Sequence, residues 1–416
     1  SEMCIRDRDM RELTTEEHKQ FNEIFENLGA SLDVPESRYD ELVSSYQAVG
    51  KFLGDESSPL APYKPEIQPQ GSFLLGTMIT PVNENDDLDI DLVCELMEKH
   101  PDWTAENLKA KVGERLKVSE RYKKLLDEEG RRCWTLLYRK NSENASDKYH
   151  LDILPCVNNE KTRLREQYFS VSVGQVDKLA LRITDRELSN YKYETDSSKW
   201  LKSNPFGYAK WFEDRCSVLT RRTVLFSEAK VGNVPAYKEK KSPLQRVVQI
   251  LKRHRDLMFN GDENKPISII ITTLAARAYN KETDVLDALV NVVNSMERYI
   301  EREPNTGLCI VRNPVNPDEN FADKWVETPQ KQLNFFAWLK QVKQDVEQII
   351  EKRGGLQLIA ESMNKPFGRD VVQRTFSAIA DNQRKNRDNN VLRATITGAL
   401  GTIGTVVKAH TFHGDE

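Results

Sequence analysis

The segment Asp87–Val93 alternates carboxylates with apolar residues and then becomes wholly apolar. This alternation has the period of a β-strand, in which side chains two positions apart lie on the same face. Asp89 and Asp91 therefore share one face, while Ile90 and Leu92 face a core. Two carboxylates side by side repel each other unless a divalent cation lies between them. The segment thus predicts a strand that presents a pair of metal ligands.

Two alternatives stay open for this strand. The alternation also fits the wet face of an edge strand, and Asp87 could pair with Asp89 instead of Asp91. Because the apolar run begins directly after Asp91, we place the metal pair at Asp89 and Asp91.

A glycine–serine turn precedes the strand, in Gln70–Thr77, and a third candidate carboxylate follows it, in His150–Pro155. Gly71 lets the backbone approach a phosphate closely, and the Ser72 hydroxyl and neighbouring N–H groups can donate to its oxygens. Asp152 is flanked by apolar residues, where an unpaired charge is costly. Taken alone, the first is typical of a simple turn and the second of a strand-end cap. Together, in this order, they indicate a two-metal site for phosphoryl or nucleotidyl transfer.

The remaining pattern predicts an α+β chain with strands first and helices afterwards. A Pro-rich connector, Pro59–Pro69, stops helix formation, and Cys133–Arg139 and Tyr149–Cys156 form an antiparallel hairpin. Helices are predicted at Thr14–Asn27, Glu36–Phe52, Thr104–Glu128, Pro243–Met258, Pro266–Asn280, Val285–Arg302 and Pro329–Lys352, with a Pro/Asn-rich loop at Asn313–Asn320. We expect a leader (1–12), a catalytic lobe that includes the N-terminal helices (13–235), a helical lobe (236–369), and a C-terminal helix with a loose tail (370–416).

Composition narrows the class of protein. The 416 residues include 61 Lys and Arg against 65 Asp and Glu, a formal net charge of −4. This balance argues against a protein that coats long nucleic acid, although a local basic groove is compatible with it. The chain has no apolar run of membrane-spanning length and no apolar signal-peptide core. Its six cysteines are scattered singly, which disfavours a zinc site or a disulfide framework and favours the cytoplasm.

The segment Gln70–Leu96 resembles the core motif of bacterial cGAS/DncV-like nucleotidyltransferases, the enzymes of CBASS anti-phage signalling systems. The wider pattern of Gly-Ser, Asp-x-Asp and a distant third Asp is that of the polymerase β-like superfamily. The similarity runs from about Glu12 to the C-terminus. It is carried further by Arg132–Leu136, His150–Pro155, Lys241–Gln245, Lys252–Asp256, Pro266–Thr273, Asn313–Pro317 and Asn320–Trp325.

The resemblance implies a two-lobed nucleotidyltransferase: a polymerase β-like core with a mixed sheet, followed by a helical lobe like that of oligoadenylate synthases. It also implies roles for individual residues. Gln70, Gly71 and Ser72 match positions that contact the donor triphosphate. Asp89, Asp91 and Asp152 match the triad that binds Mg²⁺, with Mn²⁺ as a substitute. Lys252 and Ser268 match residues that steady donor phosphates from across the cleft.

Two of these assignments have plain alternatives. Arg253 and Arg255 are also basic, so Lys252 could lie on a solvated helix face, and Ser268 could cap a helix after Pro266. Base selection is not assigned, because the aromatic pair at Trp211 and Phe212 is more typical of a core than of a stacking platform.

The implied reaction is attack of a ribose hydroxyl on the α-phosphate of a nucleoside triphosphate, repeated and closed to give a cyclic di- or trinucleotide messenger. Nucleotide transfer to RNA or to a protein is the alternative within the superfamily, and a non-catalytic conjugated adaptor is the alternative outside it.

The C-terminal segment His410–Gly414 resembles tails that ubiquitin-like conjugation enzymes join to other proteins. This chain departs from that pattern by ending in Asp415-Glu416. Conjugation through Gly414 therefore requires a peptidase to remove the last two residues.

Overall fold

The computed structural model describes residues 13–82, 88–139, 141–142, 148–158, 179–216, 231–232, 234, 236–237, 240–352, 355–389, 391, 393–394, 400–401 and 405–406. Asp87, the leader 1–12 and Gly414 lie outside these residues, so the alternative strand register and the tail hypothesis stay predictions. No helix within the described part of the chain is both long and apolar enough to cross a membrane.

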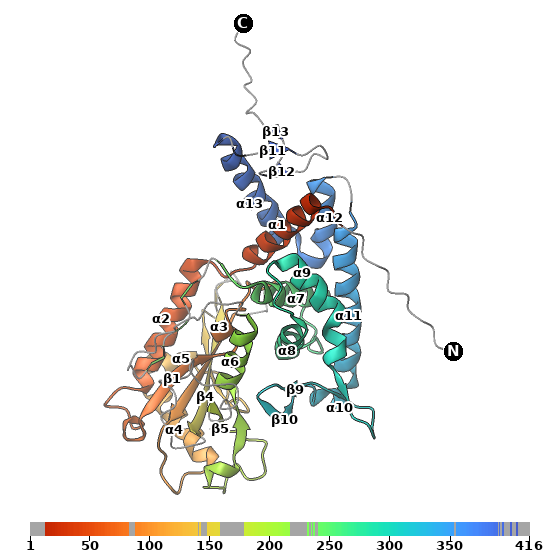
Figure 1. Ribbon diagram of the computed structural model, residues 1–416. Helices are drawn as coiled ribbons and strands as arrows, with labels where there is room; N and C mark the ends of the chain where they lie inside the picture. The colour runs from red at the N-terminus through yellow and green to blue at the C-terminus, as the bar shows by residue number, and fades with distance from the viewer. Residues whose placement is uncertain are drawn as a thin grey trace.

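A mixed six-stranded sheet forms the first lobe (Figure 1). The path runs β1-β2-β4-β5-β6, with β3 paired to β4. Only β2 and β4 run parallel; the other pairs are antiparallel. The predicted strand and the predicted hairpin are both confirmed. The strand bounds are β1 Pro65–Gln70, β2 Leu88–Leu96, β3 Trp134–Tyr138, β4 Tyr149–Asn158, β5 Leu181–Ile183 and β6 Leu201–Ser203.

The expectation that Pro59–Pro69 is only a connector is wrong in its second half. A short 3₁₀ turn, Ala61–Tyr63, is followed at once by β1. β1 is the first strand of the sheet, with β2 as its neighbour. A terminal strand tolerates proline, because the missing N–H removes no bond from the centre of the sheet.

Helices cover both faces of the sheet. One face packs on α2 (Glu36–Leu53), α4 (Ala105–Val118) and α5 (Glu120–Leu125), and the other on α6 (Pro205–Cys216). The helix predicted at Thr104–Glu128 is divided because Ser119 is extended and its side chain caps α5 through the Tyr122 N–H. The sequence reading did not predict α6.

The second lobe is helical, as expected. Its main helices are α7 Pro243–Phe259, α8 Ser268–Ala278, α9 Val285–Ser295, α10 Lys324–Glu327, α11 Pro329–Ile350, α12 Leu356–Phe367 and α13 Arg369–Asp388. The predicted helix Val285–Arg302 ends earlier, in a 3₁₀ turn at Met296–Tyr299. Beyond it lie short strand pairs, β7 Glu301–Arg302 with β8 Cys309–Ile310 and β9 Arg312–Asn313 with β10 Asn316–Asn320; β11 Arg393–Ala394, β12 Leu400–Gly401 and β13 Thr405–Val406 follow α13.

The first helix of the chain, α1 (Thr15–Ser31), packs with this second lobe (Figure 1). Its apolar side chains Phe21, Ile24, Phe25 and Leu28 are buried in the same core as α7, α9 and α13. The chain therefore leaves the helical lobe after α1, builds the sheet, and returns at α7. The expected lobe boundaries remain predictions.

Candidate active site

Strands β2 and β4 bring the predicted carboxylates onto one face of the sheet. In the parallel pairing, Asp91 lies opposite Asp152 and Asp89 lies opposite His150. Ile90, like every second residue of β2, is buried in the core under α2 and α4, so the aspartates face the other way. We call Asp89, Asp91 and Asp152 the acidic wall.

The three side chains have different environments. Asp89 is 69% exposed and its Oδ1 lies 3.6 Å from His150 Nδ1. Asp152 Oδ1 accepts a hydrogen bond of 2.5 Å from Thr135 Oγ1, on the neighbouring strand β3. Asp91 lies two positions after Asp89 on β2 and opposite Asp152 on β4. The carboxylates of the acidic wall therefore come from adjoining positions of two paired strands, and Asp89 and Asp152 each have a polar neighbour.

The carboxyl of Asp91 has a strongly raised pKa. Burial, together with the negative charges of Asp89 and Asp152, raises the pKa of this carboxyl to about 7, and Lys252 opposes the shift. Burial also raises the pKa of Asp152, against the lowering effect of its hydrogen bond from Thr135. Closely placed carboxylates that resist ionisation are what a divalent cation relieves.

The glycine–serine turn lies directly over Asp91. Gln70, the last residue of β1, pairs with Asp91 in the sheet, and Gly71 begins the short helix α3 (Gly71–Leu75). Gly71 has a φ of +60°, and a Cβ placed on it would meet Asp91 Oδ2 at 2.0 Å. Only glycine fits this close approach. The turn is therefore built against the acidic wall rather than being an isolated loop.

A cavity of about 280 Å³ separates the acidic wall from the helical lobe. Ser72, Asp89 and His150 line it from the sheet side. On the other side it is lined by Lys252, Arg255, Asp256, Lys265 and Ser268, from α7, α8 and the link between them. We call Lys252, Arg255 and Lys265 the basic wall. Gln70, Asp91 and Asp152 do not line the cavity itself but lie beneath or beside its sheet side.

Lys252 does not lie on a solvated helix face, so that alternative is wrong. Its side chain is 7% exposed and Nζ donates to the Thr77 carbonyl at 3.0 Å. Burial, reinforced by the neighbouring Arg255, lowers the pKa of Lys252 to about 8. An anion in the cavity would favour its charged form.

Ser268 does not cap α8 either. The N-cap residue is Ile267, and Ser268 Oγ accepts a hydrogen bond of 2.9 Å from Arg255 Nη1. Arg255, 6% exposed, also donates to Asp256 Oδ1 at 2.7 Å. The basic wall is therefore a hydrogen-bonded set rather than loose surface charge.

Sequence reasoning missed His150, Arg255, Asp256 and Lys265 as residues of the cavity. The first lies within the motif His150–Pro155, and the next two lie within Lys252–Asp256, but neither motif showed which members face a ligand. Phe212 is buried in the helical core, and Trp211 is partly buried against it.

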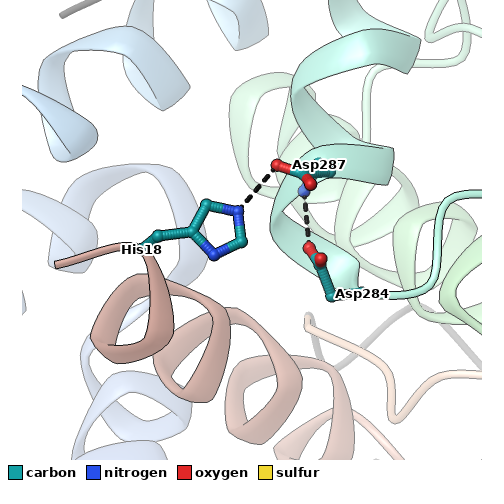
Figure 2. A group of neighbouring side chains, drawn as sticks. All are labelled: His18, Asp284 and Asp287. Atoms are coloured by element: carbon teal, nitrogen blue, oxygen red, sulfur yellow. Dashed lines mark hydrogen bonds and ion pairs between the residues drawn. The ribbon is translucent and has the colours of Figure 1, made fainter. Parts of the chain in front are cut away.

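A second group of potential ligands lies elsewhere, between α1 and α9 (Figure 2). His18, Asp284 and Asp287 have ligand atoms within 4.8 Å of one another, the only such group of three among the described residues. Ordinary contacts account for it: His18 Nε2 pairs with Asp287 Oδ1 at 2.8 Å, and Asp284 caps α9. The ligand atoms of Asp89, Asp91 and Asp152 do not all lie within 4.8 Å of one another.

The sequence is similar to known proteins along nearly its whole length. Residues 19–169 match the Second Messenger Oligonucleotide or Dinucleotide Synthetase (SMODS) domain family. The chain is 28% identical over 410 residues to a c-di-GMP synthase of Roseivirga ehrenbergii, covering 97% of this chain and 100% of the relative. It is 25% identical over 386 residues to the cyclic dinucleotide synthase CdnG of Bradyrhizobium diazoefficiens, covering 88% and 84%. Over nearly its whole length the chain is therefore similar to enzymes that synthesise cyclic dinucleotides.

The fold agrees as well. The structure of B. diazoefficiens CdnG in complex with GTP superimposes with a TM-score of 0.63 at 21% identity, covering 87% of this chain and 99% of that one. The expected α+β architecture, with a polymerase β-like core and a helical lobe, is thereby confirmed.

The residues of the acidic wall fit a divalent metal. Carboxylate oxygens are the ligands that Mg²⁺ prefers. The missing Cβ of Gly71 leaves room for the Asp91 carboxylate beside the turn, and the negative charges of Asp89 and Asp152 help to raise the pKa of Asp91. Asp89, Asp91 and Asp152 are therefore the residues that would hold Mg²⁺ or Mn²⁺.

Proposed function

We propose that this enzyme joins nucleoside triphosphates into a cyclic dinucleotide in the cavity between the acidic and the basic wall. The observation that carries the proposal is the placement of Ser72 and Asp89 on one side of a single cavity and Lys252 and Ser268 on the other. The names of both curated relatives, a c-di-GMP synthase and a cyclic dinucleotide synthase, support the product class, and GTP is the first substrate to test.

The proposed step forms one bond and breaks one. A ribose hydroxyl oxygen attacks the α-phosphorus of a triphosphate, the bond to the β,γ-diphosphate breaks, pyrophosphate leaves, and the hydroxyl proton is lost. A second such step between the joined nucleotides closes the ring. When bound, Mg²⁺ at the acidic wall supplies charge stabilisation for the attacking and leaving oxygens.

The protein side chains divide the remaining work. Asp152, whose Oδ1 accepts a hydrogen bond from Thr135, would assist removal of the hydroxyl proton. Lys252 and Ser268 hold the donor phosphates, and the Gly71–Ser72 turn offers backbone and hydroxyl donors to the same oxygens. A phosphate bound beside Lys252 would raise its pKa above the value of about 8 and favour its charged form.

The direct test is product analysis. Purified protein is incubated with each labelled triphosphate and with their mixtures, in Mg²⁺ or Mn²⁺, and the products are treated with phosphatase. A phosphatase-resistant product that gives the mass of a cyclic dinucleotide is expected. Phosphatase-sensitive linear chains, or label transferred to RNA or protein, would instead support the other acceptor classes.

Two assignments beyond the reaction remain proposals from the sequence. One is a role in anti-phage signalling in the cytoplasm, checked by plaque counts in cells that carry the wild-type gene or its Asp91→Asn variant. The other is conjugation through Gly414. Mass spectrometry of protein isolated from its native cells should show chains ending at Gly414 or joined through it; intact Asp415-Glu416 ends throughout would refute conjugation.

A further inference from the structure

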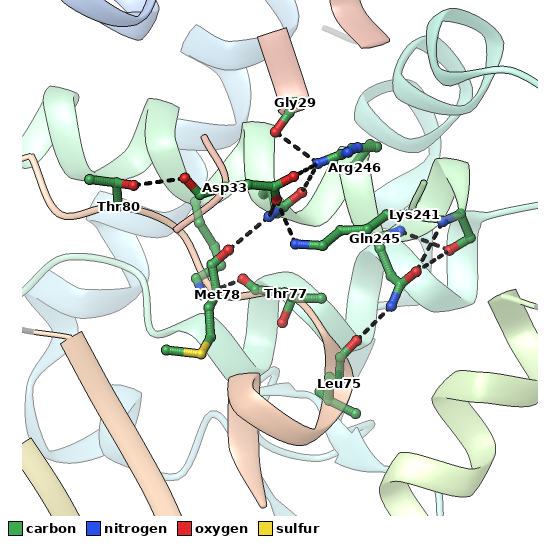
Figure 3. A network of polar contacts seen from close by, with 12 residues as sticks. Gly29, Asp33, Leu75, Thr77, Met78, Thr80, Lys241, Gln245 and Arg246 are labelled. Carbon is green, nitrogen blue, oxygen red and sulfur yellow. Dashed lines mark hydrogen bonds and ion pairs between the residues drawn. The ribbon is translucent and has the colours of Figure 1, made fainter. Parts of the chain in front are cut away.

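Helix α7 holds the chain that leaves the glycine–serine turn (Figure 3). Residues 245, 249 and 252 lie on one face of α7, at spacings of four and three. Each donates to a backbone carbonyl of the segment 75–78, which begins at the last residue of α3. The bonds are Gln245 Nε2 to Leu75 O at 2.8 Å, Gln249 Nε2 to Met78 O at 2.7 Å and Lys252 Nζ to Thr77 O at 3.0 Å.

This segment is tied back to the phosphate turn. The Thr77 N–H donates to the Ser72 carbonyl at 3.0 Å. Gly76 has a φ of +67°, and a Cβ on it would lie 2.8 Å from Gln245 Nε2, so α7 packs closely against the segment. A shift of residues 75–78 therefore moves Ser72 with it.

Asp33, just after α1, accepts hydrogen bonds from two side chains of α7 and from Lys241, which precedes α7. Its Oδ1 accepts from Lys241 Nζ at 2.5 Å and from Gln249 Nε2 at 2.8 Å, and its Oδ2 accepts from Arg246 Nη1 at 2.7 Å. Arg246 is 1% exposed and Gln249 is fully buried. A carboxylate with this many donors in a buried setting is fixed in place, because leaving any one of them unpaired is costly.

The two sets of bonds meet at Gln249. Its Nε2 donates both to Asp33 and to the Met78 carbonyl, while its Oε1 accepts from Arg246 Nη1 at 3.1 Å. Both ends of the amide are occupied by partners of the correct polarity, so the side chain has one orientation. That orientation aims its donor at the segment that leads from Ser72.

We infer that Asp33 and Gln249 are positioning residues for nucleotidyl transfer, which fix the segment 75–78, and with it Ser72, at one distance from Lys252. The inference rests on the proposed function, since it assigns Ser72 and Lys252 to the same donor triphosphate. Neither Asp33 nor Gln249 lines the cavity, so they act through the residues that do.

The test is a comparison of KM with kcat in the full-length chain. Gln249→Met keeps the side-chain length but removes both donor bonds; Asp33→Asn removes the charge that orients Gln249. Each change is expected to raise the KM for the nucleoside triphosphate about tenfold. The reason is that poorer alignment of the donor phosphates should weaken binding by about as much as the loss of one hydrogen bond. Gln249→Glu keeps the shape but cannot donate and adds charge beside Asp33, so it should raise KM at least as much.

A matched control separates positioning from simple stability. Asn291→Leu removes hydrogen bonds to the Ala278 carbonyl and to Glu282 in the same lobe, outside the cavity. It should lower the melting temperature but leave KM within twofold of the wild type. If the Asp33 and Gln249 variants behave like this control, with unchanged KM and a lower fraction of active protein, the inference is wrong. If the wild-type chain forms no nucleotide product at all, the proposed function fails first and the variants are then compared by their affinity for a non-hydrolysable GTP analogue.

Discussion

The acidic wall holds negative side chains close together, and the basic wall holds positive side chains close together. Burial, with the repulsion of the neighbouring aspartates on β2 and β4, raises the pKa of Asp91 to about 7. Lys252 is buried beside another cation, and its pKa falls to about 8. At neutral pH the Asp91 carboxyl is therefore only about half ionised, whereas Lys252 keeps most of its charge. A metal ion on one wall and phosphates on the other would return both to full charge, so each wall is completed by a ligand of opposite sign.

The walls also differ in how they are built. The acidic wall lies on adjacent strands, where register alone sets the spacing of the side chains. The basic wall depends on tertiary hydrogen bonds, from Lys252 to Thr77 and from Arg255 to Ser268. Substitutions in the first wall should therefore remove chemistry with little structural change, whereas those in the second should affect binding.

The largest expected effect comes from breaking the acidic wall. Asp91→Asn should lower the rate of product formation by at least about 10³-fold, since it removes a central metal ligand while preserving shape. The rate is measured by release of pyrophosphate. Asp102→Asn, an exposed carboxylate 88% accessible on the same lobe, serves as the control and should keep full activity. Product formation by the Asp91→Asn variant at the wild-type rate would show that the site lies elsewhere.

The next effect comes from the basic wall. Lys252→Met should raise the KM for the triphosphate by about 30-fold, because a buried charge-assisted contact to phosphate is lost, with a smaller change in kcat. Steady-state kinetics measures both parameters. Lys340→Met changes an exposed lysine on α11 and should leave them unchanged. A KM unaltered by Lys252→Met would remove Lys252 from donor binding.

The pH dependence sharpens the comparison. Since the metal must displace a proton from Asp91 below its pKa of about 7, the affinity for Mn²⁺ should fall by up to about tenfold per pH unit under that value and level off above it. Titration with Mn²⁺ between pH 5.5 and 8.5 follows this directly. A flat profile would contradict the assignment of Asp91 as a ligand.

A smaller effect concerns stability without metal. The pKa of Asp91 rises on folding from 3.8 to about 7, so the folded state binds the proton more tightly. Its contribution therefore favours folding below about pH 4 and is lost as pH rises to about 7. Metal-free Asp91→Asn should then melt a few degrees above the wild type at pH 8, an effect on the order of 2 kcal/mol. A lower melting temperature for the variant at pH 8 would contradict this reasoning.

The smallest effect is expected at Ser268. Ser268→Ala removes one hydroxyl that accepts from Arg255, and a change of about two- to fivefold in KM is expected. Ser295→Ala, on α9, is the matched control and should change KM by less. Equal effects of the two variants would indicate that Ser268 has no contact with the donor.

The same division explains what the sequence could predict. The acidic wall could be predicted because the period of a strand shows which side chains share a face. Asp89 and Asp91 alternate with buried residues, and Leu88–Leu96 is the observed strand. The basic wall could be predicted only in part. The run Lys252–Asp256 is buried by packing against other elements, and nothing in its local pattern shows which side chains face the cavity. The three-residue strands β5 and β6 are too short to leave a periodic signal, and α1 joins the helical core through contacts distant in sequence.

The central claim, that both walls hold one triphosphate, is tested most directly by calorimetric titration of a non-hydrolysable GTP analogue with and without Mg²⁺. The account predicts Mg²⁺-dependent binding to the wild-type chain, loss of the Mg²⁺ dependence in Asp91→Asn, and weaker binding at every Mg²⁺ concentration in Lys252→Met. Binding to both variants with the affinity and Mg²⁺ dependence of the wild type would contradict it.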